Sequence, residues 1–368
     1  MGNIKFLLKS QIEALLSVSP ANFTDPRQVR QVLAKEQDLL GVFGGCLNVL
    51  LYYKKACQED SGSIHAGWIK ETLGMALLEQ PLLCGRLRPK ESGEKEVEIV
   101  SNDSGVRLVE ARIPATLSEF LGSKSTREDF ESELVFWKDI DRDDPKFSPL
   151  FYVQVTKFDC GGYSFGISCT LLLADLLFKE NFLKRWAKIH NNMILSSQNN
   201  ALLKEPIFYL PNLKHDGPSS TTNILSPSPN QNSGETMIFN ISPADPNQFC
   251  LLASLCIEET EKKLMIHGEK GSEFSLIVKE GHNNDVIKIE RCSKDEQVKP
   301  KPRINSLISS SSWDDFGGYE VEFREGNKPL HVSCWIKSIS SGGLVMGIPS
   351  SSDDKDKYEA KIIVAVSN

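Results

Sequence analysis

The sequence of 368 residues lacks the patterns that mark several large classes of protein. Its nine cysteines are odd in number and none falls in C-x-x-C spacing, which favours reduced thiols over a disulfide framework or a zinc site. The apolar stretches of the first 20 residues are broken by Lys9, Gln11 and Glu13, so neither a signal peptide nor a membrane-spanning helix is expected. We therefore predict a cytoplasmic monomer without a membrane span.

An excess of positive charge is also absent. The net charge is −7 and no basic stripe with interleaved aromatic residues occurs, which argues against a general nucleic-acid binder. The six histidines have no partners at metal or catalytic-triad spacing, so no metal site is predicted. The acidic runs 139–145 and 353–356 do not follow the calcium-loop pattern and are interpreted as solvated loops.

The chain is long enough for two domains, each with its own core. Residues 199–234 are rich in Ser, Pro, Asn and Thr and contain few apolar residues after Leu213, which is typical of a linker. We therefore predict an N-terminal domain over 1–198, a crossover linker over 199–234 and a C-terminal domain over 235–368.

The stretch 151–193 is the most informative in the chain. Residues 152–158 and 163–170 alternate around a turn at 159–162, which predicts a β-hairpin. From Asp175 the apolar period becomes helical as far as Ile189, with Asp175 suited to the N-cap. His190 then falls at the end of the predicted helix, where a surface position is expected.

Periodicity predicts the other elements in the same way. Helices are expected at 5–18, 27–40, 63–78 and 243–261, strands at 46–53 and 235–241, and a hairpin over 272–292.

Several motifs, in this order along the chain, resemble those of the plant BAHD acyltransferases. That family has a strand of the type GGxSxGxSxSH that ends in HxxxDG and precedes a helix with F-L-x-x-W-A. Here the double glycine is Gly161-Gly162, the Asp is Asp175 and the helix motif is 182–187. Residues 81–87 (PLLCGRL) are similar to the family's YPLAGRL, and 97–111 to its C-N-D-x-G-V strand pair.

The departure from the family lies at its general base. The His of HxxxD removes a proton from the acceptor substrate, and the Asp holds the loop through an ionic contact; the His position is Leu171 here. Thr170 and Cys169 are the neighbouring candidates for a substitute base. A Thr hydroxyl is not a base without help, and a Cys requires a cationic partner that lowers its pKa, so neither is favoured.

The second family motif, DFGWGKP, is altered to EFREGNKP at 322–329. The resemblance implies structural rather than catalytic roles for Asp175, Trp186, Phe323 and Gly326. Between the predicted helix at 249–262 and Ser312-Trp313, the family has a longer run that forms walls of its CoA and acceptor tunnel. A compact hairpin occupies this interval here, which predicts a shortened second domain.

The resemblance implies an α+β fold of two domains, with mixed sheets and flanking helices that meet at a channel. It implies no cofactor beyond acyl-CoA as a donor substrate. Because both the base and part of the tunnel wall are lost, we favour a degenerate member that binds a partner enzyme or a small molecule in plant specialised or lipid metabolism. Eceriferum-type members assist fatty-acid elongation in this way without needing the family's His.

Two alternatives remain open. One is an acyl-CoA-dependent O- or N-acyltransferase with an unrecognised base. The other is a lyase-type reaction in the same channel, as in a family member whose His is altered.

Overall fold

The structure is a computed structural model, and it describes most of the chain. The described residues are 9–55, 66–90, 97–122, 127, 130–178, 181–199, 235–241, 249–265, 273–280, 285–294, 308–337, 342–349 and 360–366. The predicted linker falls almost wholly outside these ranges, as do His65, His215, His267 and His282 and the acidic run 353–356.

The first sheet has six strands in the order β1-β6-β7-β8-β3-β13. Their bounds are β1 Gln11–Val18, β6 Val106–Ile113, β7 Phe151–Phe158, β8 Tyr163–Thr170, β3 Cys46–Tyr53 and β13 His331–Lys337. Only the β6–β7 pair is parallel, so the sheet is mixed. Strands β8 and β3 are neighbours inside the sheet and are buried along their whole length.

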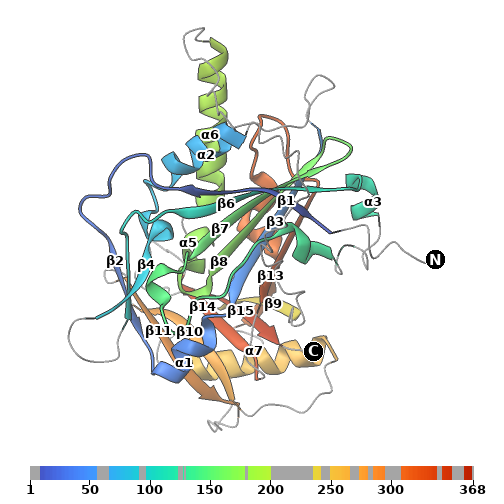
Figure 1. Ribbon diagram of the computed structural model, residues 1–368. Helices are drawn as coiled ribbons and strands as arrows, with labels where there is room; N and C mark the ends of the chain where they lie inside the picture. Colours follow the sequence, from blue (N-terminus) through green and yellow to red (C-terminus); the bar gives the residue numbers. More distant parts are fainter. Residues whose placement is uncertain are drawn as a thin grey trace, which may run out of the picture.

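The second sheet has nine strands in the order β12-β9-β15-β14-β10-β11-β2-β5-β4. Their bounds are β12 Ile308–Ser311, β9 Glu235–Ile241, β15 Ala360–Val366, β14 Leu344–Pro349, β10 Glu273–Glu280, β11 Val286–Ser293, β2 Val29–Leu33, β5 Val97–Val100 and β4 Arg86–Pro89. The pairs β10–β14 and β11–β2 are parallel. The predicted architecture of mixed sheets with flanking helices is therefore confirmed (Figure 1).

Each sheet contains strands from both halves of the chain. Strand β13, from the C-terminal half, pairs with β3 in the first sheet. Strands β2, β4 and β5, from the N-terminal half, extend the second sheet beyond β11. The two sheets thus share the chain and do not divide at a single point in the sequence.

Helices cover the sheets on the faces where apolar side chains gather. Helices α2 (Ala66–Ala76) and α6 (Phe182–Asn199) pack side by side at the first sheet, in the upper part of Figure 1. Helix α7 (Phe249–Lys263) covers the second sheet, and the short α1 (Glu36–Val42) packs against β11. The helix α3 (Leu117–Leu121) and the one-turn segment Glu131–Leu134 cover the opposite face of the first sheet, around Tyr52 and Phe120.

Two helix predictions near the N-terminus are wrong. Residues 11–18 form the strand β1, whose side chains alternate between half-buried and exposed and which pairs with β6. Residues 27–40 contain β2 followed by α1. In both cases a short stretch fits either period, and pairing with a neighbouring strand decides the outcome. The strand at 46–53, the helix within 63–78, both hairpins and the elements after the linker are confirmed.

The prediction that the cysteines are reduced thiols is wrong for one pair, because Cys250 and Cys292 form a disulfide. These residues lie 42 positions apart, on α7 and β11, and packing of the helix on the sheet brings their Cα atoms within 6.0 Å. A disulfide between residues so far apart in the sequence cannot be predicted from the spacing of the cysteines. The other described cysteines, which are Cys46, Cys84, Cys160, Cys169, Cys256 and Cys334, are free.

The prediction of a surface position for His190 is also wrong. Helix α6 continues to Asn199, so His190 lies within the helix and its side chain is fully buried. Its Nδ1 lies 3.0 Å from the Thr72 hydroxyl, which donates to the Trp68 carbonyl and accepts from the Trp186 indole. The Thr72 proton is therefore committed to Trp68, and the neutral ring donates through Nδ1.

Burial and the charge of Arg324 lower the pKa of His190 from 6.5 to about 4. Above pH 6.5 the ring is neutral in both the folded and unfolded states. As the pH falls from 6.5 towards 4, the unfolded chain binds a proton that the folded protein does not, so folding becomes less favourable.

We predict that this histidine makes the protein sensitive to mild acid. Between pH 7 and pH 4 the wild type should lose about 3 kcal/mol more unfolding free energy than the His190→Asn variant, which cannot titrate. Urea unfolding at both pH values measures the difference, because carboxylate contributions are common to the two proteins and cancel. Equal losses would contradict a buried neutral imidazole.

Candidate functional site

The position of the family base lies at one end of the first sheet. Strand β8 ends at Thr170, which pairs with Cys46 of β3, and Cys46 pairs in turn with Lys337 at the end of β13. The one-turn segment Leu171–Leu173 and the short helix α5 (Ala174–Phe178) follow directly. Helix α5 begins before Asp175, so Asp175 lies in its first turn and the N-cap interpretation is wrong.

Leu171 is part of the hydrophobic core and is only 2% exposed. Its Cδ1 lies 2.7 Å from the point that a Cβ on Gly45 would occupy, and the Lys337 carbonyl lies 3.2 Å from the same point. Leu171 therefore packs directly on the Gly45 backbone, and a side chain on residue 45 would displace it. The residue predicted to stand at the family's base position is therefore an apolar side chain in close contact with its surroundings.

Cys169 and Thr170, the two residues before Leu171, are fully buried, and no contact of either among the described residues would activate it as a base. Burial, with the nearby charge of Asp175, raises the pKa of the Cys169 thiol well above its ordinary value, so the thiolate does not form at neutral pH. The Thr170 hydroxyl has no hydrogen-bond partner among the described residues. Neither group is positioned to take a proton.

Asp175 is anchored by a buried arginine from the other sheet. Its oxygens accept from Arg30 at 2.6 and 3.0 Å, and Arg30 also donates to the Leu172 carbonyl at 2.8 Å. The Lys279 ammonium lies 3.2 Å from both Asp175 and Asp285, and Asp285 also accepts from Arg30. We call these four residues the anchor network.

The charges of the anchor network settle the state of Asp175. Burial raises the pKa of this carboxyl, but the charge and hydrogen bonds of Arg30, with those of Lys279, outweigh burial and hold the pKa below its usual range. Asp175 is therefore a carboxylate whose oxygens are fully committed to two cations. It holds the loop after β8 and is not available as a base.

Both described histidines lie far from Leu171. On β13, His331 is six residues from Lys337, the residue level with Thr170, which corresponds to about 20 Å along the strand. His190 contacts Phe323, which stacks on Phe165, five residues before Thr170 on β8. In the part of the chain that the structure describes, no imidazole reaches the base position.

The other residues with predicted structural roles gather at the far end of β8. Trp186 is fully buried and packs edge-on against Phe165 and Phe323, with ring centroids 5.6 and 4.7 Å away. Gly326 has a φ of +75° in a tight turn, where its N–H donates to Glu322 at 2.9 Å. Only glycine adopts this backbone conformation without strain.

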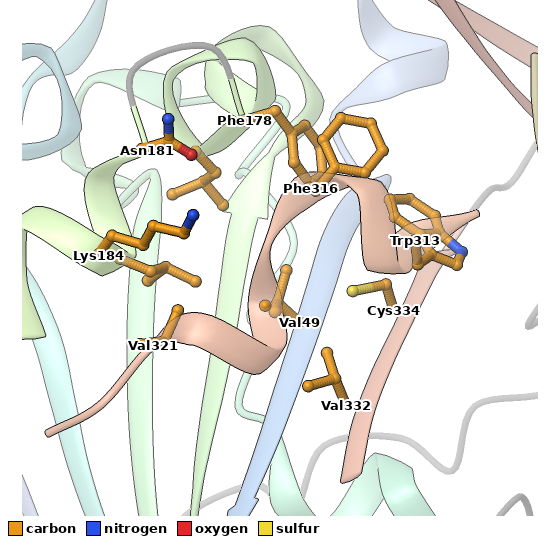
Figure 2. Close-up of a pocket in the computed structure, with 12 residues that line it drawn as sticks. Val49, Phe178, Asn181, Lys184, Trp313, Phe316, Val321, Val332 and Cys334 are labelled. Carbon is orange, nitrogen blue, oxygen red and sulfur yellow. The ribbon is translucent and has the colours of Figure 1, made fainter. Parts of the chain in front are cut away.

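An apolar pocket opens next to α5, and no sequence pattern had indicated it (Figure 2). The atom-free space at this site is about 400 Å³ including open solvent, and the cavity volume proper is about 30 Å³. Its lining comes from six segments of the chain and comprises Val49, Leu177, Phe178, Asn181, Leu183, Lys184, Trp313, Phe316, Gly318, Val321, Val332 and Cys334. Leu171 does not line it.

The pocket offers stacking surfaces and few polar groups. Phe178 and Phe316 lie against each other with ring centroids 4.2 Å apart, and Trp313 completes the aromatic side seen in Figure 2. Lys184 is ion-paired with Glu320. Such a lining suits an apolar ligand.

The acidic run 139–145 forms a loop whose side chains bond to the loop's own backbone and to one lysine of β13. Asp139 pairs with Lys337 at 3.0 Å, and Asp141 accepts from the backbone N–H groups of Asp143 and Asp144. Among the described residues, no group of acidic, histidine or cysteine side chains has the arrangement of a metal site. None of the described helices is both long and apolar enough to cross a membrane.

Comparison with known families agrees with the motifs. A model of the Transferase family matches residues 36–263, which is more than half of the chain. The chain belongs to the Transferase family, that of the BAHD acyltransferases. The matched range includes the loop after β8 and every strand of the first sheet except β1 and β13.

Some relatives within the Transferase family are named as acyltransferases, and others carry names that state no reaction. "Protein ECERIFERUM 26-like" of Arabidopsis thaliana is 24% identical over 76% of this chain and 76% of its own length. Taxadien-5-alpha-ol O-acetyltransferase of Taxus chinensis is 32% identical over 50% of this chain, but the match spans only 40% of that protein. A crystal structure of vinorine synthase aligns with 97% of this chain and 95% of its own, with 15% identity and a TM-score of 0.45.

We predict that the anchor network contributes strongly to stability. Arg30→Met should lower the unfolding free energy by about 3–5 kcal/mol, because it leaves the Asp175 carboxylate buried with only Lys279. Adding Asp175→Asn to Arg30→Met should recover part of the loss, since the unpaired charge is then removed. Urea midpoints of the single and double variants measure both effects.

Arg88→Met is the matched control. Arg88 is 54% exposed and pairs with Glu98 on the neighbouring strand, so its loss should cost less than about 1 kcal/mol. If Arg30→Met were no more destabilising than Arg88→Met, the anchor network would not hold the loop.

Proposed function

We propose that this chain is a catalytically degenerate member of the Transferase family that acts by binding. The observation that carries the proposal is Leu171, which occupies the family's base position and packs on Gly45. The anchor network beside it keeps the loop in place. On this proposal, the scaffold of the site is retained and a core side chain stands where the family has its proton acceptor.

The chemistry of acyl transfer supports this proposal. A positioned general base contributes about 10²–10⁴-fold to such a reaction, and the group must reach the acceptor proton within hydrogen-bond distance. Cys169 is held as a thiol and Asp175 is committed to Arg30 and Lys279. These states leave the described site without a general base.

The ligand that fits the structure best is an apolar small molecule in the pocket beside α5. Aromatic rings and aliphatic side chains supply eight of its twelve lining residues. The relative named ECERIFERUM 26-like matches this chain over 76% of its length, and a role in plant lipid metabolism is the one we propose here. A partner enzyme that presents an apolar segment would use the same surface.

The first test is the absence of transferase chemistry. Calorimetric titration of the full chain with CoA at about 100 µM, which lies within the range of ordinary enzyme affinities, should give no saturable heat. Leu171→His should not gain acyl transfer from acetyl-CoA, because the imidazole enters a packed core and not an open channel. Saturable CoA binding together with turnover by the wild type would overturn the proposal in favour of a transferase with another base.

Restored turnover in Leu171→His has a different meaning. It would show that the channel is intact and lacks only its base, and the packing argument would then be wrong. Leu173→His serves as the control for an imidazole introduced into the same turn at another fully buried position.

The second test concerns the pocket. The neutral dye Nile red should bind the wild type with increased fluorescence, and Val332→Trp should abolish the increase by filling the pocket. Leu330→Trp is the matched control, because Leu330 lies outside the pocket just before β13 and is 50% exposed. Equal fluorescence from both variants would mean that the dye binds elsewhere.

A further inference from the structure

The pocket beside α5 has an apolar side and a polar side. Figure 2 shows the aromatic rings of the lining on one side, and Asn181 and Lys184 on the other. These two polar residues lie three positions apart at the start of α6, where the Asn181 carbonyl accepts from the Arg185 N–H at 3.1 Å. Residues at this spacing lie on the same side of a helix. The amide and the ammonium of the pocket are therefore gathered at the N-terminus of α6.

Lys184 stands at the mouth of the pocket. It is a lining residue with a partly exposed side chain, and its ammonium end lies against the backbone of Gly317. The ammonium is ion-paired with Glu320, whose side chain is 66% exposed. An ion pair so open to water contributes little to stability. Another carboxylate can therefore replace Glu320 on Lys184 at small cost.

The start of α6 adds a second attraction for negative charge. This helix has 18 residues, and its first turn contains no acidic residue. The aligned peptide dipoles of a long helix place partial positive charge at its N-terminus, and the N–H groups of the first turn have no partner within the helix. Leu183 and Lys184 belong to this turn and line the pocket. An anion at the mouth would therefore meet the ammonium and the helix dipole together.

The size and lining of the pocket suit a ligand with an apolar body. The cavity proper, about 30 Å³, is larger than one water molecule requires, and open space around it brings the total to about 400 Å³. Because eight of the twelve lining residues are aromatic or aliphatic, the enclosed part accepts an apolar group. The open part leaves room for a head group that contacts both Lys184 and water.

We propose that the pocket binds a small amphiphile with a carboxylate head. Its apolar body packs against Phe178, Phe316 and Trp313, and its carboxylate replaces Glu320 on Lys184 at the start of α6. The inference rests on the proposed function, because it assigns a chemical class to the ligand of the same pocket. A neutral amphiphile gains the apolar contacts alone and leaves Lys184 on Glu320.

The test compares octanoate with 1-octanol, which have the same chain length and differ in the head group. At neutral pH each compound is titrated against the full chain with Nile red bound, and displacement of the dye gives its dissociation constant. The ratio of the two constants within one variant cancels any change in dye binding. The wild type should bind octanoate about tenfold more tightly than 1-octanol, which is the gain expected from one charge-assisted hydrogen bond.

Three variants assign this preference to the mouth of the pocket. Lys184→Met keeps the aliphatic stem and should abolish the preference for octanoate. Glu320→Gln should increase it, because the competing carboxylate is removed. Lys188→Met is the matched control, since Lys188 lies one turn further along α6, is exposed and does not line the pocket, and it should keep the wild-type ratio.

The outcomes separate this inference from the function on which it rests. Equal affinities of the wild type for the two compounds, or a preference that survives Lys184→Met, would overturn the carboxylate head and leave apolar binding in place. An equal loss of preference in Lys184→Met and Lys188→Met would reveal a general effect of charge and would also overturn it. A wild type that binds no Nile red would overturn the proposed binding in the pocket itself.

Discussion

The ion pair between Arg30 and Asp175 is the interaction on which the arrangement of this protein depends. Arg30 belongs to the second sheet and Asp175 to the loop that leaves the first, so one buried contact fixes the two layers against each other. Lys279 and Asp285, from the hairpin β10–β11, neutralise the remaining charge. A buried ion pair is costly to leave incomplete, so the pair holds the loop after β8 in its form.

The loop after β8 keeps its form, and Leu171 in that loop is a core residue. In the family, a loop of this kind presents a base; here the same loop presents Leu171 to the core. Leu171 packs on Gly45, so this side chain contributes to the stability of the core. A surface suited to an apolar ligand remains in the aromatic pocket beside α5.

Each half of the chain also contributes strands to both sheets, which joins the two sheets further. Because β13 completes the first sheet and β2, β4 and β5 extend the second, neither sheet forms from one half alone. The pocket beside α5 is built in the same way, from β3 and α5 on one side and from the segment 313–334 on the other. Contacts that create the pocket are therefore the contacts that hold the fold together.

The sequence alone determined the family and the hairpin around β7 and β8, because these are carried by local patterns that span a few residues each. The sequence did not determine β1 or β2. These short segments fit a helical pattern as well, and pairing with β6 and β11 makes them strands. The tertiary structure alone decided the partner of Asp175, the burial of His190 and the disulfide between Cys250 and Cys292. Each of these features joins residues more than 40 positions apart or depends on what covers a helix. Such contacts do not produce a periodic pattern in the sequence, so they could not be predicted from it.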